Sequence, residues 1–327
     1  MLSRVAENLY WISRYVERAE NVARLLDVGF HLELDAATVT RQAGELGPTE
    51  SVVTILACRK SFDATHPTGA EVSVEAQRDA VLRFLTFDRH HEHSILTMLA
   101  HARENARATQ ETLSGEAWSQ VNRLYLYLRS RRARRRFATS PARFYEGVKH
   151  ACVLFTGLVD GTLPRNEVYH FLQVGRYLER VNQISRILNI KMHGLREGGP
   201  VAEPPMRIVH WSSLLWSCSA YESYLRDHHD RIDPEGVVRY LVLDPHFPRS
   251  LRFCVARCRE SLREIAGRGD DDGYSSEAER QLGRLDSELR YIDVAEIFAQ
   301  GLSPFLHGVQ DACHRVGEEL HHAYFHT

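Results

Sequence analysis

Two segments of the chain carry the same charged pattern, Arg-Tyr-x-Glu-Arg, which begins at Arg14 in one and at Arg176 in the other. Their glutamates, Glu17 and Glu179, are candidates for general acid–base catalysis if their environments make one a stronger acid than the other. The neighbouring arginines would bind an acidic or phosphorylated ligand and keep nearby carboxylates ionised. Glu17 and Glu179 are therefore the predicted catalytic residues, each a candidate general base.

Residues three and four positions apart share one face of a helix, so each segment should present a polar stripe. A third charged segment, around Arg103, is repeated as Arg259, Glu260 and Arg263. The predicted ligand-binding residues come from these stripes: Tyr10, Arg14, Arg18, Asn21, Arg103, Glu104, Asn105, Arg107, Arg176, Tyr177 and Arg180.

The same charges have two structural interpretations. Glu17 could pair with Arg176, and Glu179 with Arg14, as a reciprocal lock between two parts of the chain. Alternatively, each stripe is a solvated face with weak pairs between successive helical turns. The pattern alone leaves the site, the lock and the solvated face open.

Other motifs are less informative. A carboxylate-bridged metal centre needs Glu-x-x-His on partner helices, which both segments lack, and the histidines of "RHHEH" (89–93) are a weak zinc motif, so no metal is predicted. The run "RSRRARRRF" (129–137) suits RNA or an acidic partner, but such a run is more often a solvated helix end, and nucleic acid is not the expected partner.

The elements that position these residues are helices. Apolar residues recur every three or four positions in twelve runs, separated by short breaks rich in Gly, Pro and polar residues. The runs are 5–28, 50–64, 72–86, 92–113, 116–136, 141–159, 165–192, 207–229, 234–242, 248–267, 276–291 and 294–324. This predicts an all-α protein, a compact helical bundle of about twelve helices.

The two halves of the chain repeat one another in several blocks that keep the same order. The matching blocks are 83–95 with 239–251, 100–107 with 256–263, 116–124 with 277–285, and 144–152 with 305–313. We therefore predict a single domain, 1–327, made of two duplicated six-helix halves, approximately 1–162 and 163–327. Closed pairing of two such halves gives pseudo-twofold symmetry, with the charged stripes facing each other in a pocket between the repeats.

Composition sets limits on the class of protein. A net charge of -2 gives no overall attraction to nucleic acid or anionic membranes. The first residues, "MLSRVAENLYW", carry charges where a signal peptide is apolar, and no uncharged run reaches the length of a membrane span. The six cysteines form no CxxC pair, which favours buried thiols in a reduced, cytoplasmic protein.

The segments "LSRVAENLYWISRYVERAENVARLLD", "SILTMLAHARENARATQETLSGEAW", "GRYLERV" and "LLWSCSAYESYLR" resemble the bacterial Alpha-E family. The resemblance covers essentially the whole chain and implies a helical partner of a circularly permuted ATP-grasp protein, in a system that also includes a transglutaminase-like protein and forms peptide or amino-acid amides. It implies no cofactor in this chain, with ATP and Mg on the partner ligase, and an acidic amino-acid or peptide ligand. One alternative is an enzyme in its own right, with Glu17 or Glu179 as general base in amide formation or transfer. A further alternative is an arginine-rich scaffold or nucleic-acid-binding protein.

Overall fold

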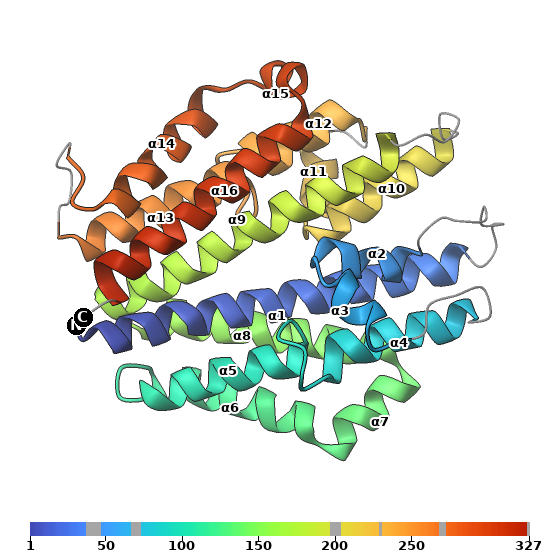
Figure 1. Cartoon of the computed structure of the whole chain (residues 1–327), viewed down its shortest axis with the longest axis horizontal. Helices are drawn as coiled ribbons and strands as arrows, with labels where there is room; N and C mark the ends of the chain where they lie inside the picture. The colour runs from blue at the N-terminus through green and yellow to red at the C-terminus, as the bar shows by residue number, and fades with distance from the viewer. Residues whose placement is uncertain (37–46, 67–72, 197–203, 229–230, 268–272, 326–327) are drawn as a thin grey trace. The chain divides into compact units, whose positions relative to one another are not determined.

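The computed structural model describes residues 1–36, 47–66, 73–196, 204–228, 231–267 and 273–325, and these residues are almost entirely helical (Figure 1). They form sixteen α-helices and two π-helical segments, and no strand occurs in this part of the chain. The predicted all-α class is therefore confirmed.

The helices begin and end close to the predicted runs. In chain order they are α1 (Ser3–Ala36), α2 (Pro48–Ile55), α3 (Arg59–Asp63), α4 (Val74–Phe87), α5 (Ile95–Ala108), α6 (Gly115–Arg129), α7 (Arg131–Thr139), α8 (Pro141–Thr162), α9 (Glu167–Arg196), α10 (Pro204–Ser217), α11 (Tyr221–His228), α12 (Pro234–Val238), η1 (Arg239–Leu243), α13 (Leu251–Ile265), α14 (Glu277–Tyr291), α15 (Val294–Gln300), α16 (Leu302–Leu320) and η2 (His321–Phe325).

The helix count exceeds the predicted twelve because four of the predicted runs are each broken once. Ala57, Ser219 and Gly301 adopt positive φ angles of 55°, 54° and 92°, which end a right-handed helix. Ser130 breaks the run 116–136. Its extended backbone separates α6 from α7, and its side chain accepts a hydrogen bond from the Ala133 amide as the N-cap of α7. Ala57 and Ser219 carry no sequence signal for such a turn.

The chain divides into two compact units. Unit 1 consists of Met1–Arg14 and Pro164–Thr327, and unit 2 of Tyr15–Leu163. The break after Leu163 lies one residue from the predicted boundary between the repeats. The first turns of α1 belong to unit 1, however, and the remainder of this helix belongs to unit 2.

In unit 1, four helices form a closed bundle: α9 packs against α13 and α16, and α14 packs against the same two helices (Figure 1). Leucine, valine and cysteine side chains such as Leu262, Val309 and Cys258 fill its interior. Helix α10 packs against α9 and also contacts α11 and α12, and η1 contacts α12, α13 and α14. The bundle holds α9, which carries Glu179, rigidly in the core.

Unit 2 has a related internal order. Helix α6 packs against α5 and α8, α7 packs against α6 and α8, and α4 joins α2 to α5. The succession α5–α6–α8 corresponds to α13–α14–α16 in unit 1, which supports the predicted duplication.

One turn has the same construction in both units. The Ser94 hydroxyl caps α5 by accepting from the Thr97 amide and donates to the carbonyl of Asp88. Ser250 caps α13 in the same way and donates to the carbonyl of Asp244. Each aspartate side chain also accepts from the amide two residues later, at 2.8 Å for Asp88 and 2.7 Å for Asp244. The shared turn is further support for a duplication, which stays a prediction.

Among the described helices, none has a stretch of the length and hydropathy needed to cross a membrane.

Candidate functional site

A buried ion pair joins α1 to α9 within unit 1. The Arg14 Nε and Nη2 atoms each lie 2.8 Å from Oε2 of Glu179. The other carboxylate oxygen, Oε1, accepts a hydrogen bond of 2.8 Å from the Gln183 side chain. Arg14 Nη1 donates to the Tyr10 hydroxyl at 2.7 Å, and the Glu179 side chain has 0% of its surface exposed. The predicted pairing of Arg14 with Glu179 is therefore confirmed.

The surroundings of this ion pair are close-packed. The backbones of α1 and α9 approach so closely that a Cβ atom on Gly175 would lie 2.2 Å from the Tyr10 carbonyl oxygen. The Tyr10 ring packs against Phe325 with ring centroids 5.4 Å apart, and the Arg14 guanidinium lies 5.1 Å from the Trp11 ring. These contacts leave Glu179 inaccessible to a substrate from the side of α1.

Electrostatics keep the Arg14 guanidinium charged and the Tyr10 phenol neutral. Burial alone would lower the pKa of Arg14, but Tyr10 and Glu179 outweigh burial and raise it above its ordinary value. Burial raises the pKa of Tyr10, against the opposing effect of Arg14. A carboxylate with both oxygens engaged and no exposed surface favours the lock over general-base catalysis. The catalytic role of Glu179 stays a prediction.

Of the two arginines near Glu179 on α9, Arg180 binds another element of unit 1, whereas Arg176 binds a residue of α9 itself. Arg180 is 8% exposed, and its Nη1 donates to the Pro248 carbonyl at 3.0 Å, in the turn that precedes α13. Arg176 donates to the Tyr177 hydroxyl at 2.7 Å and lies over the same ring at 4.6 Å. Successive residues point about 100° apart on a helix, so Glu179 and Arg180 tie α9 to two different neighbours.

The remaining predicted residues lie in unit 2 and fall into two groups. Glu17 and Asn21 are buried, at 4% and 1% exposure, whereas Arg18 is partly exposed. Because Glu17 and Arg176 belong to different units, their predicted pairing stays a prediction, as does a single pocket between the repeats.

The second group lies on α5. Arg103 donates to Asn122 at 2.7 Å and also pairs with Glu104, which accepts a second bond from Arg107 at 2.9 Å. The hydrogen bond from Arg107 is the main cause that lowers the pKa of Glu104. Asn105 is partly exposed, and its carbonyl accepts from Thr109. Glu104 and Arg107 are 51% and 62% exposed, so this group fits the solvated-face interpretation.

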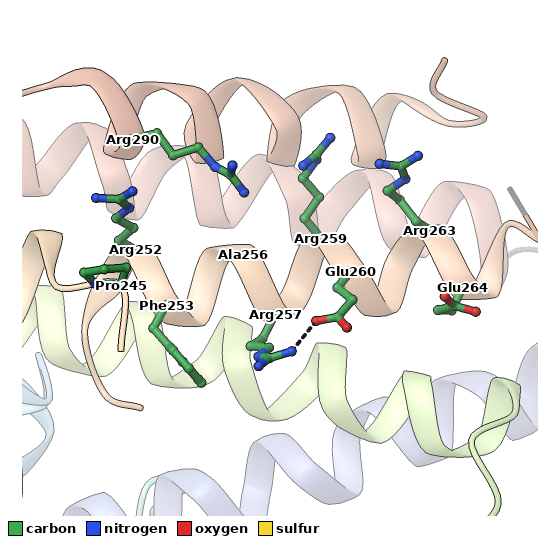
Figure 2. Close-up of a pocket in the computed structure, with 10 residues that line it drawn as sticks. All are labelled: Pro245, Arg252, Phe253, Ala256, Arg257, Arg259, Glu260, Arg263, Glu264 and Arg290. Atoms are coloured by element: carbon green, nitrogen blue, oxygen red, sulfur yellow. Dashed lines mark hydrogen bonds and ion pairs between the residues drawn. The ribbon is translucent and has the colours of Figure 1, made fainter. Parts of the chain in front are cut away.

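The corresponding segment of unit 1 lines a groove of about 640 Å³ along α13 and α14. Figure 2 shows Arg252, Arg259 and Arg263 on one side of α13, the side that faces Arg290 of α14. The groove is lined by Pro245, Arg252, Phe253, Ala256, Arg257, Arg259, Glu260, Arg263, Glu264 and Arg290. Only Arg259, Glu260 and Arg263 had a signal in the sequence, as the repeat of the Arg103 segment.

A buried carboxylate organises two of these arginines. Asp286 of α14 is 2% exposed, and its Oδ2 atom lies 2.9 Å from Arg290 Nε and 3.2 Å from Arg259 Nη1. A guanidinium has five N–H donors, so both arginines retain donors for a second anion. Arg257 pairs with Glu260 at 2.6 Å, whereas Arg252 contacts only a backbone carbonyl among the described residues. With five arginines against two glutamates, the lining is net positive and suits a carboxylate or phosphate.

Comparison with known proteins assigns the family. The sequence model of Alpha-E, described as a predicted alpha-helical domain with a conserved ER motif, matches residues 1–325. The chain belongs to the Alpha-E family. Glu17-Arg18 and Glu179-Arg180 are Glu-Arg dipeptides in the matched region, and the second is the pair that ties α9 to its two neighbours.

Relatives of this Alpha-E chain include the uncharacterized protein Mb2597 of Mycobacterium bovis and the uncharacterized proteins MT2643 and Rv2567 of Mycobacterium tuberculosis. Each is 23% identical over 316 residues, which cover 91% of this chain and 34% of the relative. The chain thus spans about a third of the length of these relatives. No solved structure matches it.

The histidine-rich turn of this Alpha-E chain has a structural explanation. His91 is buried and stacks on Phe84 with ring centroids 4.2 Å apart, and burial lowers its pKa, so the imidazole is neutral at pH 7. Among the described residues, no three His, Cys, Asp or Glu side chains gather in a group that could hold a metal ion.

The six cysteines of the Alpha-E chain are all buried, as predicted, and none of them forms a disulfide bond. Burial raises the pKa of Cys58 and of Cys313 to about 12 each. An exposed thiol has a pKa of about 8.5, so the unfolded chain loses these protons first. Between about pH 9 and 12 the unfolded state therefore binds fewer protons, and stability must fall as the pH rises.

We expect the free energy of unfolding to be lower at pH 10 than at pH 8, by up to about 1.4 kcal/mol per pH unit for each thiol. Urea unfolding at the two pH values measures this difference. The Cys58→Ala/Cys313→Ala variant should have a shallower pH dependence. Equal stability of the unmodified chain at both pH values would contradict the expectation.

Proposed function

We propose that this chain is the helical binding component of an ATP-grasp-linked system that forms peptide or amino-acid amides, and that its ligand is acidic. The observation that carries the proposal is the arginine groove of α13 and α14, in which buried Asp286 fixes Arg259 and Arg290. A buried carboxylate that orders two guanidinium groups prepares their free donors for a ligand oxyanion. The ligand would be an acidic amino acid, a short acidic peptide or an acyl phosphate.

The lining of the groove favours binding over catalysis. It contains no cysteine, histidine, serine or lysine that could act as a nucleophile or proton carrier at neutral pH. One of its two glutamates, Glu260, is held by Arg257. In this proposal the partner ligase supplies ATP, Mg and the chemical step, and the Alpha-E chain holds or delivers the acidic component in the cytoplasm.

The length of the relatives supports a protein partner. In the mycobacterial proteins, the region similar to this chain is joined to sequence that makes up the other two thirds of the polypeptide. A domain that occurs within longer chains is suited to working beside another domain. The circularly permuted ATP-grasp partner, and a transglutaminase-like protein as a further component, follow from the family resemblance and belong to the proposal.

Titration calorimetry with L-glutamate, a Glu-Glu dipeptide and inorganic phosphate tests the groove. We expect at least one of these probes to bind, and Arg259→Gln to weaken binding by about tenfold because one charge-assisted contact is lost. Arg290 remains to pair with Asp286 in this variant, so the fold should persist.

Arg280→Gln is the matched control, since Arg280 lies on α14 outside the groove and pairs with Glu277. It should bind the probes as the unmodified chain does. Absence of binding for all three probes, or equal losses in both variants, would refute the groove as the ligand site.

A further inference from the structure

A positive surface of unit 2 lies around α7 and includes the arginine run of residues 129–137. No Asp or Glu occurs between Glu116 and Glu146, and that stretch holds eight arginines. All eight are exposed: Arg123, Arg129, Arg131, Arg132, Arg134, Arg135, Arg136 and Arg143. We call these eight residues the α7 arginine surface.

Several arginines elsewhere in the chain pair with a carboxylate, unlike the arginines of this surface. Arg24, Arg59, Arg239 and Arg280, for example, each pair with a carboxylate. Among the described residues, no arginine of the α7 surface forms a salt bridge with a carboxylate. Arg123 and Arg129 donate to Gln120 and Tyr125, which are neutral. The positive charge of the surface is therefore uncompensated.

Helix α7 is fixed on its inner side. Ala133 and Phe137 are buried, and the Phe137 ring lies 5.1 Å from Phe87 and 5.5 Å from Phe144. Arg134 packs over the Phe87 ring at 4.9 Å, while Ser130 caps the start of the helix. The remaining arginines of α7 are thus presented on a rigid support. A basic helix that inserts into a membrane needs a free apolar face, and the apolar face of α7 is occupied.

We infer that the α7 arginine surface is a docking site for an acidic segment of a partner polypeptide. Guanidinium groups on a fixed helix form forked hydrogen bonds with carboxylates, and the partner would neutralise charges that this chain leaves unpaired. The mycobacterial relatives carry additional polypeptide beside the region similar to this chain. The occupant of the surface is therefore taken to be a polypeptide. Single-stranded nucleic acid is less suited, because the one aromatic residue of α7, Phe137, is buried and cannot stack on a base.

Fluorescence anisotropy with a labelled glutamate-rich peptide tests the docking site. The full chain should bind the peptide, and affinity should fall as salt is raised from about 50 to 200 mM. The R131Q/R132Q/R135Q variant should bind at least about tenfold more weakly. It leaves Arg134 and the buried anchor residues unchanged, so circular dichroism should match the unmodified chain.

The control variant R231Q/R239Q/R280Q removes three charges elsewhere, from arginines that pair with Asp233, Glu235 and Glu277. It should bind the peptide with unchanged affinity. The binding of single-stranded RNA and of duplex RNA, each with the same formal charge as the peptide, is measured for comparison. No peptide binding, equal loss in the control, or tighter binding of either RNA than of the peptide would overturn the proposal.

Discussion

Replacing Arg14 by leucine is expected to lower the free energy of unfolding of unit 1 by about 3–5 kcal/mol. The substitution leaves Glu179 without its two Arg14 donors at a position with no exposed surface. The hydrogen bond from Gln183 to the other carboxylate oxygen would remain. A buried charge that loses its partner keeps its desolvation cost without the compensating attraction, so the loss exceeds the value of the pair itself.

The double variant Arg14→Leu/Glu179→Leu tests whether the stability is lost because the Glu179 charge is left unpaired. Apolar residues often replace a buried ion pair at little cost, so the second substitution should restore much of the lost stability. Arg239→Leu, which removes an exposed partner of Glu235, should cost less than about 1 kcal/mol. Chemical unfolding followed by circular dichroism measures all three variants. A loss for Arg14→Leu no larger than for Arg239→Leu would argue against a buried lock.

The sequence predicted the helical class, and it gave the Arg14–Glu179 contact as one of three interpretations, because both depend on periodic patterns of residues. Apolar spacing reports which face of a helix is buried, and the repeated Arg-Tyr-x-Glu-Arg segments placed complementary charges on two helices. The breaks at Ala57 and Ser219 were missed, since a positive φ at alanine or serine is imposed by surrounding packing rather than by the residue type.

The sequence indicated only some of the residues that form the arginine groove. Repetition drew attention to Arg259 and Arg263, but Asp286 lies in a helix of ordinary charged composition, "RLDSELR". Its burial depends on how α14 packs against α13, which is a property of the tertiary structure. Likewise, the repeats place residues 1–14 in the first half, whereas packing places them with the second.

A difference between the repeats does signal the close approach of α1 and α9. The residue before each Arg-Tyr pair is Ser13 in the first repeat and Gly175 in the second. At Gly175 even a methyl group would fall 2.2 Å from the Tyr10 carbonyl oxygen and 3.0 Å from its carbonyl carbon. These are backbone atoms, so a rotamer change cannot relieve the clash, and the two helices would have to separate.

Gly175→Ala is therefore expected to destabilise unit 1 by about 1–3 kcal/mol or more, although alanine is the better helix former. Gly283→Ala on α14 is the matched control, because a Cβ atom there meets nothing within 4 Å. That control should instead stabilise the chain by about 0.5–1 kcal/mol. Chemical unfolding of both variants provides the comparison. If the backbones of α1 and α9 are in contact, the two substitutions must change the free energy of unfolding in opposite directions. A stabilising effect of both substitutions would show that this contact does not limit the packing of unit 1.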